Sequence, residues 1–219
     1  ESAEFTRRFL RCVNDRVPVI VGVSNPGTAN LVKLSKVAMD AGASGVMVAP
    51  LTGLKTEAQI VTYFADVIAA LGEKIPVVYQ DYPQSTQADI SAQSFLKVVD
   101  THPSVVMFKH EDCPGLKKLT QIRTACDGSA RRYISILVGN GGLSVPQQLA
   151  RGAGGALTGF ARPEMLVSVC ALFAAGRSGE AEDLFDVYLP LVRHEQQPGF
   201  GLAVRKEILR RRGAIRSAA

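Results

Sequence analysis

Six short apolar runs recur along the chain, separated by stretches with helical periodicity. The runs are rich in β-branched residues and hold few polar positions, which is typical of strands buried on both faces. They span 17–23, 45–50, 75–80, 104–109, 135–140 and 155–160. Their starts lie 28, 30, 29, 31 and 20 residues apart. This spacing indicates a repeated strand–helix unit.

The segments between the runs repeat apolar residues at intervals of three and four, which is the period of an amphipathic helix. The stretch 88–91 offers an N-cap for the helix that runs through Val99. The predicted helices span 28–41, 56–71, 92–99, 163–175, 178–194 and 202–212. Regular alternation of strand and helix predicts a parallel α/β protein.

Two architectures fit this alternation, a doubly wound open sheet and a (β/α)8 barrel. The Gly-x-Gly-x-x-Gly fingerprint of dinucleotide-binding sheets does not follow the first strand. The glycine-rich turn at 139–142 lacks the lysine and the spacing of a P-loop. We therefore predict a (β/α)8 TIM barrel over 1–175, lacking its first two βα units because the chain begins within a helix. A helical C-terminal segment is predicted over 176–219.

The composition is that of a folded globular protein, with 47% hydrophobic and 21% charged residues. The net charge of +5 arises after residue 192, where the sequence has seven Lys or Arg and two Glu. The basic run 205–212 is interpreted as the solvated face of a terminal helix, so no nucleic-acid partner is expected. No apolar run is long enough to span a membrane. Four separated cysteines indicate reduced thiols and a cytoplasmic protein.

Reactive side chains at strand ends are the candidates for chemistry, because a parallel barrel places its active site there. Tyr79 ends the third run, Lys109 ends the fourth, Asn140 ends the fifth and Thr158 lies in the sixth. Of these, the lysine is the least expected after a run of apolar residues.

Lys109 is predicted to enter a poorly solvated barrel mouth, where desolvation disfavours the ammonium form. The free amine could then attack a keto acid and form a Schiff base. The alternative is a structural lysine paired with Glu111 or Asp112. Tyr79 lies on the adjacent strand, about 4.8 Å away, and could relay protons for the lysine. The alternative interpretation of Tyr79 is an aromatic residue with a purely structural role.

The order of these motifs resembles the dihydrodipicolinate synthase and N-acetylneuraminate lyase family, the pyruvate-type class I aldolases. The resemblance extends over nearly all 219 residues. The segments that carry it are 18–22, 75–79, 106–109, 139–140, 155–158 and 189–191.

The resemblance implies a Schiff-base lyase or synthase acting on pyruvate or another 2-keto acid, with an aldehyde as second substrate. Lys109 matches the Schiff-base lysine and Tyr79 the proton-transferring tyrosine. No cofactor or metal is implied, and a homotetramer or homodimer is expected. The substrate-binding positions that it implies are Gly139, Asn140, Leu157 and Thr158.

The chain departs from the synthase pattern in two places. The synthase binds the aldehyde carboxylate through an arginine shortly after its tyrosine, and 80–86 contains none. It also uses an aromatic residue from a neighbouring subunit, and 49–53 contains none. Both departures favour another 2-keto acid. A 2-keto-3-deoxy sugar acid dehydratase or aldolase of the same family is therefore the main alternative.

Two further classes stay open. A metal-dependent aldolase could use His110, Glu111 and Asp112 as ligands, although the other two histidines lie away from strand ends. A barrel that binds a keto acid without catalysis is the second.

Overall fold

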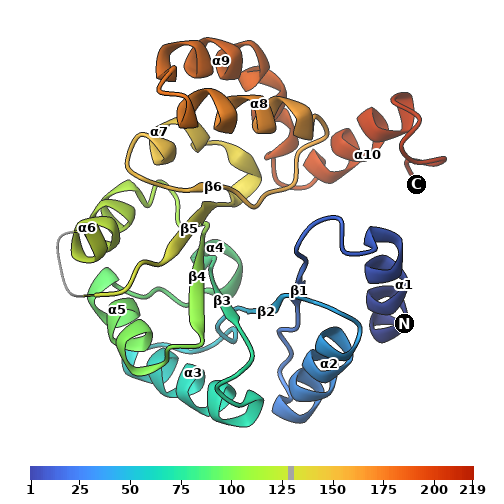
Figure 1. The fold of residues 1–219 in the computed structure, drawn as a ribbon. Helices are drawn as coiled ribbons and strands as arrows, with labels where there is room; N and C mark the ends of the chain where they lie inside the picture. Colours follow the sequence, from blue (N-terminus) through green and yellow to red (C-terminus); the bar gives the residue numbers. More distant parts are fainter. Residues whose placement is uncertain (128–130) are drawn as a thin grey trace. The chain divides into compact units, whose positions relative to one another are not determined.

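The computed structural model describes residues 1–127 and 131–219 (Figure 1). They form two compact units. The first comprises 1–112 and 124–135, and the second comprises 113–123 and 136–219. The predicted division into 1–175 and 176–219 stays a prediction.

The first unit alternates strands and helices, as the apolar periodicity predicts. Its elements are α1 (Ser2–Val13), β1 (Ile20–Gly22), α2 (Thr28–Asp40), β2 (Gly45–Val48), α3 (Glu57–Leu71), β3 (Val77–Asp81), α4 (Pro83–Thr86), α5 (Ala92–Thr101) and β4 (Val105–His110). Each strand pairs in parallel with the next one in the chain. The parallel α/β prediction is thus confirmed.

Local side-chain chemistry sets the helix starts in this unit. The Thr56 hydroxyl accepts the Gln59 backbone N–H at 3.2 Å, and the Gln59 side chain accepts the Thr56 N–H at 3.1 Å. This capping box begins α3. The predicted cap of α5 is also present, because the Ser91 hydroxyl accepts the Ser94 N–H at 3.2 Å.

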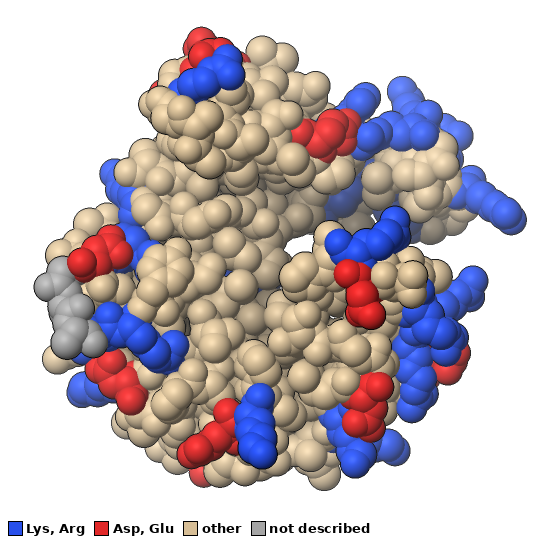
Figure 2. Space-filling model, viewed as in Figure 1, with Lys and Arg blue, Asp and Glu red and all other residues tan. Residues whose placement is uncertain are grey.

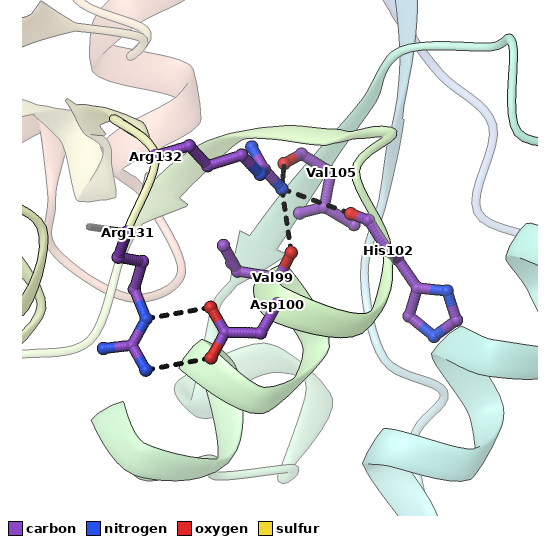
Figure 3. Close-up of polar contacts among 6 residues, drawn as sticks. All are labelled: Val99, Asp100, His102, Val105, Arg131 and Arg132. Atoms are coloured by element: carbon purple, nitrogen blue, oxygen red, sulfur yellow. Dashed lines mark hydrogen bonds and ion pairs between the residues drawn. The ribbon is translucent and has the colours of Figure 1, made fainter.

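Arg132 fixes the connection between α5 and β4 (Figure 3). Its Nη2 donates to the carbonyl oxygens of Val99, His102 and Val105 at 3.0, 3.2 and 2.5 Å. These groups include the orphan carbonyl acceptors at the end of a helix, which need a partner when partly buried. The neighbouring Arg131 forms a two-pronged pair with Asp100 at 2.8 and 2.9 Å. The start of β4 is thereby fixed to α5.

The second unit is mostly helical. Its elements are β5 (Ser135–Val138), the 3-10 turn η1 (Asn140–Gly142), α7 (Val145–Leu149), β6 (Gly155–Ala156), α8 (Pro163–Ala174), α9 (Ser178–Glu195) and α10 (Gly201–Arg211). β5 and β6 pair in parallel. α6 (Leu116–Asp127) runs from this unit into the first. The three C-terminal helices begin and end within one residue of their predicted bounds.

The strands differ more from prediction than the helices do. β3 continues to Asp81, so Tyr79 lies inside it and not at its end. β5 ends at Val138 and β6 at Ala156, so Asn140 and Thr158 follow their strands. A hydrophobic run in the sequence indicates which residues are buried. The ends of a strand are set instead by its hydrogen bonds to the neighbouring strand.

The basic run near the C-terminus lies on α10, over which Figure 2 shows Lys and Arg side chains gathered. Arg210 and Arg211 both pair with Glu207, at 2.7 and 2.8 Å. Among the described residues, no helix is long and apolar enough to cross a membrane.

Candidate active site

Lys109 lies on β4, one residue before the strand ends. Its side chain is only 12% exposed, and its Nζ lies 3.1 Å from Oε2 of Glu111, which is equally buried. The sequence alternative of pairing with Glu111 is therefore present in the structure. A lysine and a carboxylate in contact, sheltered from water, form a proton-transfer pair.

Gln80 completes this group. It is the register partner of Lys109 in the parallel pairing of β3 with β4. Its Nε2 donates to the same Glu111 oxygen at 2.6 Å. Gln80 is not among the site residues predicted from the sequence, because the register between β3 and β4 that pairs it with Lys109 is seen only in the structure.

Tyr79 lies on the other face of the strand. Its register partner is Phe108, and successive side chains of a strand point to opposite faces. Its ring stacks on Phe64 of α3 at 4.1 Å between centroids and meets Phe95 of α5 edge-on at 5.3 Å. The structure thus brings Gln80, and not Tyr79, to Lys109.

The Tyr79 phenol is fully buried in this aromatic layer. Its oxygen has no hydrogen-bond partner among the described residues. Burial, and after it the negative charge of Asp81, raises the pKa of the phenol well above its ordinary value of 10.0. The phenol therefore stays protonated throughout the neutral range.

A second polar group lies on the Tyr79 face, at the ends of the same two strands. Asp81 and His110 are register partners and both are fully buried. Each of Asp81, His110 and Asp112 offers a ligand atom, and these atoms lie within 4.8 Å of one another. One imidazole and two carboxylates suit a divalent transition metal. In the sequence, His110 and Asp112 flank Glu111, which instead contacts Lys109.

The remaining predicted site residues belong to the second unit. Gly139 precedes the η1 turn, in which Asn140 and Gly141 adopt positive φ of 46° and 65°. The Gln196 side chain occupies the space where a Cβ on Gly141 would lie. The end of α9 thus packs directly on the turn that carries Asn140.

Leu157 extends the β5–β6 ladder, because its N–H donates to the Val138 carbonyl at 2.8 Å. Thr158 next to it lines a hollow of about 370 Å³ against α8, together with Leu166 and Cys170.

The chain matches the model of the dihydrodipicolinate synthetase family over residues 1–218. It is 31% identical over 217 residues to L-2-keto-3-deoxyarabonate dehydratase of Azospirillum brasilense, covering 97% of this chain and 68% of that protein. It is 29% identical to 4-hydroxy-tetrahydrodipicolinate synthase of Clostridium novyi, over 83% of this chain and 58% of that enzyme.

Comparison with a solved structure supports the same family through the fold. Dihydrodipicolinate synthase from Rhodopseudomonas palustris superposes with a TM-score of 0.96 and 44% identity. The match covers all of this chain and 72% of that one. The match over the full chain, together with the parallel strands and the strand-end lysine, assigns this chain to the dihydrodipicolinate synthetase family.

Proposed function

We propose that this chain carries the Schiff-base centre of a lyase or synthase acting on pyruvate or another 2-keto acid, with Lys109 as the nucleophile. The observation that carries the proposal is the sheltered contact of Lys109 with Glu111, 3.1 Å apart at the end of β4. The parallel strands belong, in this proposal, to a (β/α)8 barrel, which places strand ends at the active site.

The reaction begins when Glu111 accepts a proton from the Lys109 ammonium and frees the amine. The nitrogen attacks the keto carbon, and the former carbonyl oxygen takes one proton from the nitrogen and one from the protonated Glu111. It leaves as water, so that a protonated imine and a Glu111 carboxylate remain. The imine draws electrons from the neighbouring carbon, which loses a proton and gives an enamine. Glu111 is the base for that proton, and the Gln80 amide keeps its carboxylate in place.

The proposal includes three reactions that pass through the enamine. The enamine adds to an aldehyde in a synthase, and it is formed by carbon–carbon cleavage in a lyase. In a 2-keto-3-deoxy sugar acid dehydratase, the hydroxyl on the next carbon leaves as water instead. The similarity to the Azospirillum brasilense dehydratase supports dehydration, and the lack of an arginine in 80–86 argues against the synthase reaction.

Substrate contacts by Gly139, Asn140, Leu157 and Thr158 remain part of the proposal. A cytoplasmic location and a homo-oligomer also belong to it, and the family assignment supports both.

A metal-dependent aldolase is the second candidate, favoured by the Asp81, His110 and Asp112 group. In that case the three residues would hold the ion, which would supply charge to stabilise an enolate. A chelator separates the two candidates, because Schiff-base chemistry needs no metal.

The deciding experiment is borohydride trapping of the full-length protein with pyruvate, followed by peptide mass spectrometry. A reduced adduct on the peptide carrying Lys109 is the expected result. Lys109→Arg should lose the adduct, whereas Lys97→Arg, at an exposed position on α5, should keep it. A folded protein that traps neither pyruvate nor longer 2-keto acids would overturn the proposal.

A further inference from the structure

Three side chains of ligand type meet where β3 and β4 end, within the first unit. Asp81 and His110 are register partners and are fully buried. Asp112 follows His110 by two residues and is half-buried. One ligand atom from each of the three lies within 4.8 Å of the other two. The fold thus gathers an imidazole and two carboxylates from two different strands.

The backbone ladder and the aromatic layer hold this group in place. The Glu111 backbone N–H donates to the Asp81 carbonyl oxygen at 2.8 Å, so the pairing of β3 with the β4 segment continues past His110. The His110 ring packs on Phe108, with 5.6 Å between the ring centroids, and Phe108 packs on Tyr79 at 5.7 Å. Because these neighbours already restrict the ligands, an ion that binds here orders few additional side-chain rotations.

The charges of the group favour a cation. Two carboxylates and a neutral imidazole together carry two negative charges, and burial of such charge is costly unless it is compensated. A divalent ion balances both charges, and mixed nitrogen and oxygen ligands suit a transition-metal ion such as Zn²⁺ or Co²⁺. Zinc holds these ligands at about 2.0–2.2 Å, so two of them lie at most about 4.4 Å apart. Small side-chain rotations therefore suffice to close the group around an ion.

We propose that Asp81, His110 and Asp112 bind a divalent transition-metal ion that stabilises the ends of β3 and β4. The ion joins the two strands, because Asp81 comes from one and the other ligands come from the next. Lys109 and its register partner Gln80 point to the opposite face of these strands, so the ion lies away from the proposed nucleophile. The inference does not rest on the proposed Schiff-base function. It gives the ion a structural role, in contrast to the metal-dependent aldolase.

Calorimetric titration with Zn²⁺ tests the site on full-length protein that has been freed of metal with EDTA and then of the chelator. One ion per chain is the expected result. Asp81→Asn and His110→Gln should each weaken binding by at least about tenfold, the lower end of the cost of losing a group that merely supports a ligand. His102→Gln removes a histidine of the same unit outside the group and should bind as the parent does. A parent without one-to-one binding, or an equal loss in His102→Gln, overturns the inference.

Two further measurements decide the matter if the variants of the buried ligands do not fold. Asp112→Asn changes the half-buried ligand and should also weaken Zn²⁺ binding by at least about tenfold. In the parent loaded with Co²⁺, proton NMR should show hyperfine-shifted signals from the His110 ring, and His102→Gln should retain them. A Co²⁺ complex with no shifted imidazole signal overturns the inference.

The role of the ion is read from stability and from borohydride trapping. Zn²⁺ should raise the urea midpoint of the parent by mass action, and raise that of Asp112→Asn less. Trapping of pyruvate on Lys109 should be the same with and without EDTA. Trapping that requires the ion overturns the structural role. A protein that binds Zn²⁺ at this group but never traps a 2-keto acid overturns the Schiff-base proposal and leaves the metal site standing.

Discussion

Glu111 Oε2 lies 3.1 Å from the Nζ of Lys109, and the same oxygen accepts a hydrogen bond from Gln80 at 2.6 Å. One carboxylate oxygen is thus shared between the proposed nucleophile and a neutral amide from the adjacent strand. The amide orients the carboxylate without adding charge.

Glu111→Gln should slow enamine formation at least about 100-fold, the usual contribution of a general base. Deuterium exchange into the methyl group of pyruvate, followed by NMR, measures this step without knowledge of the second substrate. Borohydride trapping should still give the Lys109 adduct. Glu73→Gln, at an exposed position, is the control. Equal exchange rates in Glu111→Gln and the parent would exclude Glu111 as the base.

Tyr79→Phe should leave the exchange rate unchanged, because the phenol lies on the opposite face from Lys109 and has no hydrogen-bond partner among the described residues. Tyr79→Ala should instead lower the free energy of unfolding by about 3–5 kcal/mol, since it leaves a cavity in the aromatic layer. Urea unfolding and the exchange assay report the two effects. A large rate loss in Tyr79→Phe would show that the phenol takes part in the chemistry, as the resemblance implies.

Alkaline stability gives a separate test of the Tyr79 environment. The folded state raises the pKa of this phenol above its unfolded value of 10.0. Above that pH the unfolded chain loses the proton while the folded chain keeps it, so stability present below pH 10 is lost as the pH rises. The slope approaches about 1.4 kcal/mol per pH unit. Urea unfolding between neutral pH and the alkaline limit should show a shallower loss in Tyr79→Phe. Parallel pH profiles would contradict the buried position.

Arg132→Met should lower the free energy of unfolding by about 2 kcal/mol, because three carbonyl acceptors at the α5–β4 connection lose their donor. Arg131→Met, which breaks the partly exposed pair with Asp100, should have a much smaller effect. Urea unfolding of the two variants compares adjacent arginines directly. Equal losses would mean that the carbonyl contacts contribute nothing beyond the loss of a charge.

Much of the fold could be predicted from the sequence, because its determinants are local. The apolar periodicity and the Ser91 cap place most helices within two residues of their observed bounds. The site is harder to predict from the sequence, because it depends on the face of the strand from which each side chain projects. Tyr79 seemed to end its strand since Gln80 and Asp81 are polar, but both continue the ladder with β4.

The contact of Arg205 with Gly159 had no local signal at all. The two residues lie 46 positions apart in the sequence, and the contact depends on how α10 packs on the segment after β6. A basic run on a terminal helix predicts a solvated face, and only the structure separates Arg205 from its neighbours. Contacts of this kind depend on how distant segments pack, and the spacing of apolar residues along the sequence gives no information about that.

The aromatic layer around Tyr79 has a practical consequence for optical spectroscopy. The chain has no tryptophan and only five tyrosines. Tyr79 stacks on Phe64 and is the one fully buried tyrosine among the described residues, so it should give the strongest tyrosine signal. Near-ultraviolet circular dichroism of this protein is therefore a selective optical signal of an intact first unit.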